Sequence, residues 1–539
     1  MKKNILQKTT LILLVLSLVF TAGCANYQDK ANAKNVIFMV ADGQSAAITT
    51  MARWYAGEQS LALDEMACGL VRTYAADSAI TDSAPAATAY ATGHKSHTGY
   101  IGVLPDVANM PGLDPIPEGD ERKPVATLLE AARLAGKSTG IISTSELMHA
   151  TPASFTSHFP DRRNYDVLSE HQVYQDADVM LGGGSQFFTS EARNDGEDLI
   201  AEIVNNGYDY ITTPEEMKNS DSKKLWGMFA DTAMAYDFDR DPAKEPSLAE
   251  MTEKAISVLS QNKDGFFLLV EGSKVDWAAH ANDPIGVISD TLAFDNAVKT
   301  ALEFAKSDKN TVVIAVTDHG TGGITIGSET TNSGYDQTHI DEFLETLKRA
   351  KLTGEGVEKM LNDDRSNIEE VMAEYYGIHD LDESEIKAIE TFQPGTLNYT
   401  IGRFISQRAN IGWTTSGHTG EDVPLYIFAH DMYKIGGVVE NTDVAKYIET
   451  LLGVDLEDTT SRLFVPAQSA FEQNGAQVSI DDSDSQNPVF VAEKDGKILR
   501  LPINKNLAFL NDDEIKLDGL VVDNGITTFV PQYAVDLLQ

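Results

Sequence analysis

The stretch NVIFMVADG at residues 35–43 decides the fold class that this sequence predicts. Six successive apolar residues follow Asn35, and a continuous apolar run of this length is typical of a parallel strand that is buried on both faces. The run ends at Asp42-Gly43, where the chain is expected to leave the sheet. The stretch therefore predicts a central strand with a carboxylate at its carboxyl end.

Strand-like and helix-like segments alternate after this first strand. Further strands are expected at residues 139–143, 266–270 and 311–316, one helix is expected to open at Pro124, and another is expected over residues 248–259. This alternation predicts an α/β fold with three layers, in which a central, mostly parallel sheet lies between helices. Ligands of such sheets bind outside the carboxyl ends of the strands, so ionisable residues at those ends are the first candidates for a site.

The composition of the chain divides it into several regions. We expect residues 35–327 to form the first part of the core and residues 409–454 to complete it. Residues 328–408 are rich in Glu, Asp and Lys and carry helical apolar stripes, which predicts a helical insertion that is a lid, a subunit contact or a solvated decoration. Residues 455–539 carry hairpin signals such as Asp495-Gly496 and predict a small β subdomain.

Residues 1–25 have the pattern of a secretory signal. Three lysines accompany an apolar segment at residues 11–20 that is too short to span a bilayer. The sequence TAGC at residues 21–24 resembles a bacterial lipoprotein cleavage box, so Cys24 is expected to carry a lipid anchor unless ordinary signal cleavage occurs nearby. We therefore expect an exported protein that is periplasmic, an outer-membrane lipoprotein or secreted, with residues 26–34 as a tether.

The charge of the chain restricts its partners. With 82 acidic and 42 basic residues, the formal net charge is −40, which argues against nucleic-acid binding because phosphate backbones need cationic partners. A phosphate-binding site in such a chain needs metal ions or arginine. The only cysteines are Cys24 and Cys68, so Cys68 has no intramolecular partner if Cys24 is lipidated or removed, and no disulfide framework is expected.

The stretch TDSAPAATAYATG at residues 81–93 predicts a turn that leads into a helix of small residues. Asp82 and Ser83 stand at its start, and Gly93 stands at its end. A helix N-terminus presents unpaired N–H groups, which suit a phosphate or a serine oxygen that acts as a nucleophile. The alternative is that Ser83 only caps a core helix.

Histidines and carboxylates are grouped in the second half of the core. Asp276 and His280 are four residues apart, which places them on one face of a helix, and this pair of ligand types suits zinc. Asp318-His319 directly follow the strand expected at residues 311–316. A single histidine at a strand end is usually a core or turn residue, but several such groups together predict a metal centre.

Two further carboxylates, Asp42 and Glu271, also stand at the ends of expected strands. A set of oxygen ligands such as these two with a hydroxyl favours Mg²⁺, whereas mixed nitrogen and oxygen ligands favour Zn²⁺. The residues alone therefore predict more than one kind of metal site.

The order of these motifs resembles that of the alkaline phosphatase family. The matching segments run in order from residue 35 to about residue 429: Asp42-Gly43, Thr81-Asp82-Ser83-Ala84, His149-Ala150-Thr151-Pro152-Ala153, Glu271-Gly272 through Asp276 to His280, Thr317-Asp318-His319, and Ser416-Gly417-His418-Thr419. His149 together with Trp277 is similar to the marine and cold-active bacterial members, and both would flank a third metal.

The resemblance implies two Zn²⁺ ions and one Mg²⁺ ion. One zinc site would consist of Asp276, His280 and His418, the other of Asp42, Asp318 and His319, and the magnesium site of Asp42, Thr151 and Glu271. The family position of the phosphate-gripping arginine falls on Arg162, and Asp82 would orient that arginine rather than bind a metal. Ser83 would be the residue that becomes phosphorylated.

The resemblance implies hydrolysis of phosphate monoesters with broad specificity, and a homodimer in which the insertion contacts the partner. The alternatives are a phosphodiesterase or sulfatase-like hydrolase on the same metal scaffold, and a phosphate-binding protein without activity. The first of these usually has a threonine or a modified residue as nucleophile and lacks an equivalent of Arg162. The sequence departs from the family pattern at Gln44-Ser45 and at Pro85, but proline is tolerated in the first turn of a helix.

Overall fold

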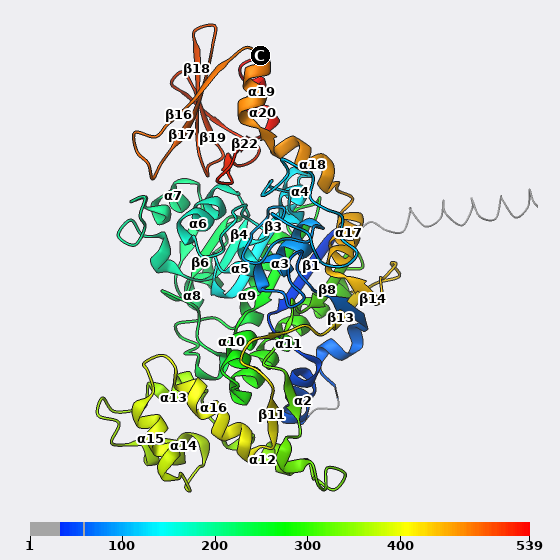
Figure 1. Ribbon diagram of the computed structural model, residues 1–539, viewed down its shortest axis with the longest axis vertical. Coiled ribbons are helices and arrows are strands. Elements are labelled where there is room, and N and C mark those ends of the chain that lie inside the picture. Colours follow the sequence, from blue (N-terminus) through cyan, green and yellow to red (C-terminus); the bar gives the residue numbers. More distant parts are fainter. Residues whose placement is uncertain (1–32, 58–59) are drawn as a thin grey trace, which may run out of the picture.

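The computed structural model describes residues 33–57 and 60–539 (Figure 1). The expected signal at residues 1–25, including Cys24, lies outside these residues. Among the described helices, none combines the length and the apolar character needed to cross a membrane.

A ten-stranded sheet forms the centre of the molecule, in the order β14-β2-β13-β8-β1-β7-β3-β4-β6-β5. Strand β13 is antiparallel to both of its neighbours, and every other pairing in the sheet is parallel. The strands are β1 (Asn35–Ala41), β2 (Ala67–Arg72), β3 (Ser138–Glu146), β4 (Val179–Gly183), β5 (Asp209–Ile211), β6 (Leu225–Met228), β7 (Phe266–Gly272), β8 (Thr311–Val316), β13 (Val423–Ala429) and β14 (Gly437–Glu440).

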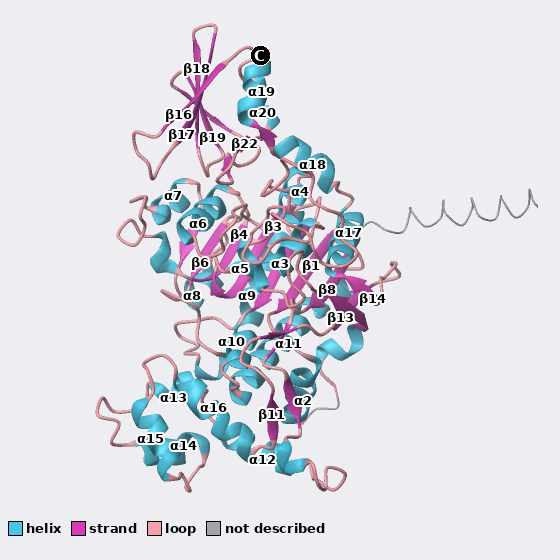
Figure 2. Cartoon of the chain, in the orientation of Figure 1, coloured by secondary structure: helices cyan, strands magenta, loops and turns pink. Residues whose placement is uncertain are grey.

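Helices cover both faces of this sheet (Figure 2). Alternate side chains of β1 point to opposite faces, so Phe38 packs in one apolar cluster and Met39 packs in the other. Helices α3 (Ser83–Thr92), α4 (Leu128–Leu134), α6 (Tyr165–Tyr174), α7 (Leu199–Asn205) and α17 (Asn441–Leu452) supply the first cluster, and α9 (Leu248–Leu259) and α11 (Pro284–Ser307) supply the second. The predicted three-layer α/β fold is confirmed.

The start of α4 differs from the sequence-based prediction. The helix was expected to open at Pro124, but it begins at Leu128, after the N-cap Thr127. The Thr127 hydroxyl accepts a hydrogen bond from the Glu130 N–H at 3.2 Å, and the Glu130 carboxylate accepts one from the Thr127 N–H at 2.9 Å. This reciprocal capping box satisfies the backbone N–H groups of Thr127 and Glu130. A helix that began at Pro124 would not form this capping box.

The segment between β8 and β13 contains the helices of the insertion. These are α12 (Asp341–Arg349), α13 (Gly354–Glu358), α14 (Ile368–Tyr376), α15 (Glu383–Thr391) and α16 (Leu397–Arg408). Their apolar side chains share one cluster with α2 (Ala46–Ala56), α10 (Lys274–His280) and α11, so the insertion is packed onto the core. Figure 1 shows α13–α16 at one end of the long axis of the molecule.

The C-terminal strands lie at the opposite end of that axis (Figure 1). A five-stranded antiparallel sheet contains β16 (Gln477–Asp481), β17 (Val489–Lys494), β18 (Lys497–Pro502), β19 (Leu507–Leu510) and β20 (Asp513–Lys516). Asp495-Gly496 forms the two-residue turn between β17 and β18, as its hairpin signal predicted. A three-stranded sheet of β15 (Val465–Pro466), β22 (Thr528–Val530) and β21 (Val522–Asp523) lies beside helices α18 (Leu456–Leu463), α19 (Ala467–Gln473) and α20 (Gln532–Asp536).

Candidate active site

Three buried carboxylates meet at the carboxyl ends of three adjacent strands. Asp42 follows β1, Glu271 lies in β7 and Asp318 follows β8, and β1 pairs with both of the other strands. All three residues are fully buried. Both carboxylate oxygens of Asp42, and one oxygen each of Glu271 and Asp318, have no hydrogen-bond partner. Because unpaired buried anions are costly, this donor set fits metal cations.

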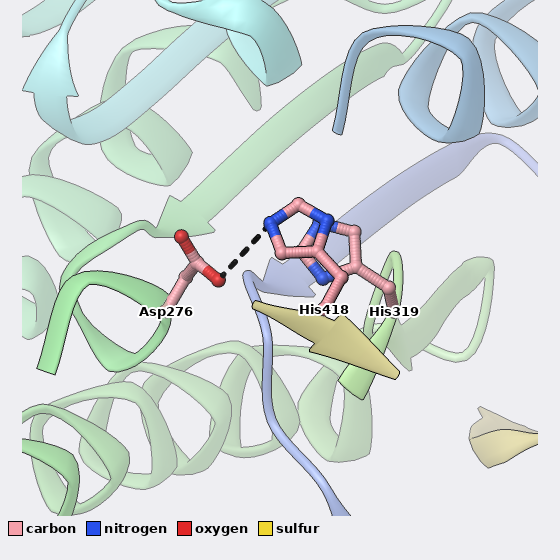
Figure 3. Close-up of side chains that lie close together, drawn as sticks. All are labelled: Asp276, His319 and His418. Carbon is pink, nitrogen blue, oxygen red and sulfur yellow. Dashed lines mark ion pairs between the residues drawn. The ribbon is translucent and has the colours of Figure 1, made fainter. Parts of the chain in front are cut away.

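A second group of ligand atoms comes from α10 and from the short strand β12 (His418–Thr419). Nε2 of His280 lies 3.3 Å from the Asp276 carboxylate and 3.1 Å from Nε2 of His418. The rings of His418 and His319 stack with their centroids 3.6 Å apart (Figure 3). These contacts bring Asp276, His280 and His418 together, as the predicted first zinc site requires, with His319 directly beside them.

The described residues contain three groups of His and acidic side chains whose ligand atoms all lie within 4.8 Å of one another. They are Asp276 with His319 and His418, Asp42 with Asp318 and His319, and Asp42 with His149 and Glu271. The second group has the same members as the second predicted zinc site. In the third group His149 joins two of the three predicted magnesium ligands, while the hydroxyl of the third, Thr151 in α5 (Ala150–Ala153), is buried without a partner.

Ser83 is the first residue of α3, and its hydroxyl lies 3.2 Å from Nε2 of His319. The cap of this helix is Asp82 and not Ser83, because the Asp82 carboxylate accepts a hydrogen bond from the Ala84 N–H at 2.8 Å. The alternative in which Ser83 serves as the cap is therefore wrong, and its hydroxyl is left available for chemistry. Pro85 lies in the first turn, which leaves the helix intact.

Arg162 faces the start of α3. Its guanidinium forms an ion pair with the Asp82 carboxylate, and its other terminal nitrogen lies 3.1 Å from Nε2 of His149. The Gly99 N–H donates to the second Asp82 oxygen at 2.6 Å, and the Arg162 N–H donates to the Gly99 carbonyl at 2.8 Å. The predicted partners Asp82 and Arg162 are thus in direct contact, and Gly99 contacts both of them.

Comparison with known proteins assigns this chain to a family. The family model described as Alkaline phosphatase matches residues 33–454. Alkaline phosphatase 4 of Bacillus subtilis is 38% identical over 454 residues, which cover 79% of this chain and 90% of that protein. The chain belongs to the alkaline phosphatase family. It is therefore an enzyme that hydrolyses phosphate monoesters, and none of these matches favours the phosphodiesterase or sulfatase-like alternative.

Two solved alkaline phosphatases are similar in structure. The cold-active enzyme from the psychrophile Shewanella sp. is 29% identical with a TM-score of 0.67, and the match covers 78% of this chain and 99% of that one. The enzyme of Thermus thermophilus is 28% identical with a TM-score of 0.69, with 79% and 92% covered. The two matches have similar TM-scores and cover similar shares of this chain.

The end of the chain has a different relationship. A family model described as Copper amine oxidase N-terminal domain matches residues 454–536, which contain the C-terminal strands. None of the predicted phosphatase site residues lies in this segment.

The charges of the alkaline phosphatase site interact strongly. Burial raises the pKa of Asp42 well above its ordinary value, and the charges of Asp318, Asp276 and Glu271 raise it further. Burial also raises the pKa of Glu271 to about 7. Burial opposes ionisation of Asp276 too, but its hydrogen bond with His280 and the neighbouring histidine charges lower its pKa. Ionisation of Asp42 and Glu271 is therefore unfavourable unless a positive charge compensates it.

His149 is the site histidine that contacts Arg162. Burial and the charge of Arg162 lower its pKa to about 3, so its ring is neutral and Nε2 accepts the hydrogen bond from Arg162. Its ring meets that of Trp277 edge to face, with centroids 5.7 Å apart. His149 is therefore held on two sides, and its Nδ1 is buried without a partner.

The sequence analysis missed several hydroxyl groups that support the carboxylates. The Ser143 hydroxyl donates to Glu271 at 2.5 Å and lies 2.9 Å from the Ser273 hydroxyl. The Thr321 hydroxyl donates to Asp276 at 2.6 Å. Ser143 ends the strand expected at residues 139–143, and Ser273 lies shortly after the strand expected at residues 266–270. Their positions indicated that they lie near the edge of the sheet, but serine as a residue type does not indicate that it supports a carboxylate.

Chelation is expected to destabilise the enzyme in a pH-dependent way. In the metal-free protein, Glu271 has a pKa of about 7 against an ordinary value of 4.5. Between these two pH values, the Glu271 carboxyl keeps a proton in the folded state that it releases in the unfolded state. The contribution of Glu271 to the free energy of unfolding is fully present below pH 4.5 and is lost as the pH rises through 7. We expect chelation to lower the thermal unfolding midpoint, measured by scanning calorimetry.

The matched variant for this measurement is Glu271→Gln, which has no charge to bury. Between about pH 5 and about pH 8, metal-free Glu271→Gln should gain stability relative to the metal-free wild-type protein. If the difference in stability between Glu271→Gln and the wild-type protein stays constant over this pH range, or shifts in favour of the wild-type protein as the pH rises, this account of the site is contradicted.

Proposed function

We propose that Ser83 is the nucleophile of this alkaline phosphatase and is phosphorylated during each turnover. The observation that carries the proposal is the position of its hydroxyl at the start of α3, 3.2 Å from Nε2 of His319, which belongs to one group of ligand atoms with Asp42 and Asp318. A helix start supplies N–H groups and a partial positive charge for the phosphoryl group.

The proposed metal content is two Zn²⁺ ions and one Mg²⁺ ion. The residues that would hold zinc are Asp276, His280, His418, Asp42, Asp318 and His319, and those that would hold magnesium are Asp42, Thr151 and Glu271, with His149 and Trp277 beside them. When bound, such ions lower the pKa of a hydroxyl or water and stabilise the negative charge of the departing oxygen.

The residues of the chain position the phosphoryl group. Arg162 would donate two hydrogen bonds to phosphate oxygens, and Asp82 would hold the guanidinium at the start of α3. Ser83 Oγ forms the new bond to phosphorus while the bond to the alcohol oxygen breaks, and the alcohol leaves on the opposite side. Water then breaks the Ser83 phosphoester, which releases inorganic phosphate and restores the hydroxyl. Because these groups contact the phosphoryl end, we propose broad specificity.

We also propose export of the protein, because residues 1–25 have the pattern of a secretory signal. The protein would be periplasmic, an outer-membrane lipoprotein anchored at Cys24, or secreted. Activity in the cold and a homodimeric state, with the insertion reaching the partner, remain part of the proposal, supported by the resemblance to the family.

Replacement of the proposed nucleophile tests the mechanism directly. Ser83→Ala is expected to lower kcat for a phosphate monoester by more than about a thousandfold, because the neighbouring hydroxyl of Thr81 donates to the Asp82 carbonyl at 2.9 Å and forms no hydrogen bond with His319 in the described site. The control is Ser78→Ala, since the Ser78 hydroxyl donates only to the nearby Ile80 carbonyl. A Ser83→Ala enzyme that keeps a tenth of the wild-type kcat would contradict the proposal.

The phosphate grip is tested with two neighbouring arginines. The Arg162 side chain is 23% exposed and faces the site, whereas that of Arg163 is 87% exposed and pairs with Asp161. Arg162→Ala is expected to raise the inhibition constant of inorganic phosphate by about 10- to 100-fold, because it removes two charge-assisted hydrogen bonds. Arg163→Ala should change it by less than about twofold. Equal effects of the two substitutions would show that general surface charge, and not a specific grip, attracts phosphate.

A further inference from the structure

A cavity of about 760 Å³ lies beside the active site, between the core and the helical insertion. Its core wall is formed by Trp277 and His280 of α10, and its other wall by Glu355 of α13 and Asn398 and Tyr399 of α16. The insertion of the same chain therefore forms one side of the approach to the site.

A chain of three histidines connects the nucleophile to the cavity. Ser83 contacts His319, the His319 ring stacks on His418, and His418 contacts His280, whose ring borders the cavity. In an in-line displacement the attacking and leaving oxygens occupy opposite sides of phosphorus. We take this order of contacts as the direction of the in-line displacement, so that the alcohol is expected to depart toward His280 and the cavity that it borders.

The wall that the insertion contributes is held firmly against the core. The Asp239 carboxylate accepts a hydrogen bond from the Thr353 N–H at 2.8 Å, just before α13 begins. The Ser406 hydroxyl of α16 donates to the Asn282 carbonyl at 3.2 Å. A Cβ atom on Gly354 would lie 2.4 Å from Cα of Asn398, so α13 and α16 also pack closely on each other. The cavity is thus a fixed part of the fold.

The carboxylates in the cavity wall already have partners within the chain. Glu355 pairs with the buried Lys274 at 3.3 Å. The Glu358 carboxylate accepts hydrogen bonds from the N–H groups of Gly395 at 2.6 Å and Leu397 at 3.3 Å. These contacts reduce the attraction of the cavity for a cationic group.

The aromatic groups, in contrast, have free surface. Tyr399 is 44% exposed, and Trp277 is partly exposed on the opposite wall. Burial and then the charge of Asp276 raise the pKa of the Tyr399 hydroxyl, so this side chain lies within electrostatic reach of the site. Aromatic side chains bind flat rings by stacking and edge-to-face contact.

We propose that this cavity binds the alcohol portion of the substrate and favours phosphate monoesters whose alcohol carries a flat aromatic ring, with Tyr399 as the residue that contacts the ring. The inference rests on the proposed function, because it takes Ser83 as the attacking group. It adds a preference among leaving groups to an enzyme whose other contacts are to the phosphoryl end.

The test compares two substrates in the full-length, metal-loaded enzyme. Tyr399→Ala is expected to lower kcat/KM for adenosine 5′-monophosphate about fivefold, mainly through KM, and to lower kcat/KM for glycerol 3-phosphate less than twofold. Tyr399→Phe keeps the ring and should behave as the wild-type enzyme does. The matched control is Tyr533→Ala in α20, since Tyr533 is 43% exposed and lies in the C-terminal region.

Every outcome of this test either supports or overturns the inference. Equal losses for both substrates, or a raised inhibition constant for inorganic phosphate, would show that Tyr399 supports the site as a whole, and would overturn the inference. No loss for either substrate, or a wild-type preference for phosphoethanolamine over the nucleotide, would overturn it as well. If Ser83→Ala keeps a tenth of the wild-type kcat for these monoesters, the proposed function itself fails, which is distinguishable from all of these results.

Discussion

The mutual repulsion of buried carboxylates is the constraint on which the rest of this structure depends. Adjacent parallel strands β8, β1 and β7 end together, so Asp318, Asp42 and Glu271 are forced into one buried space. Their own hydrogen bonds leave several oxygens without partners. Metal cations satisfy this arrangement, and the same cations supply the positive field that a phosphoryl group needs in a chain with a net charge of −40.

Another carboxylate, that of Asp82, links the proposed nucleophile to the arginine that we propose binds phosphate. It caps α3, binds the Gly99 N–H and pairs with Arg162. The opposite end of α3 is fixed separately, because the buried Tyr90 hydroxyl donates to the Thr317 carbonyl at 2.9 Å, next to Asp318-His319. The position of α3 is therefore set at its start by Asp82, which pairs with Arg162, and near its end by Tyr90, which contacts Thr317.

Much of the fold and site could be predicted because the relevant signals are local. The apolar run before Asp42 identified a central strand, and the four-residue spacing of Asp276 and His280 placed both on one face of α10. The choice between Asp82 and Ser83 as cap could not be made from sequence, because either side chain can accept the helix N–H bond. Tyr399 was not identified, since its role depends on how the insertion packs on α10, and no local pattern encodes that distant contact.

The most direct test of the account is to locate the phosphate on the enzyme. The metal-loaded protein is mixed with a phosphate monoester, quenched in acid within a single turnover, digested and analysed by peptide mass spectrometry. The account predicts phosphate on Ser83, and none on the same peptide from chelated protein. Phosphate on another residue, or equal labelling of Ser83 with and without metal, would contradict it.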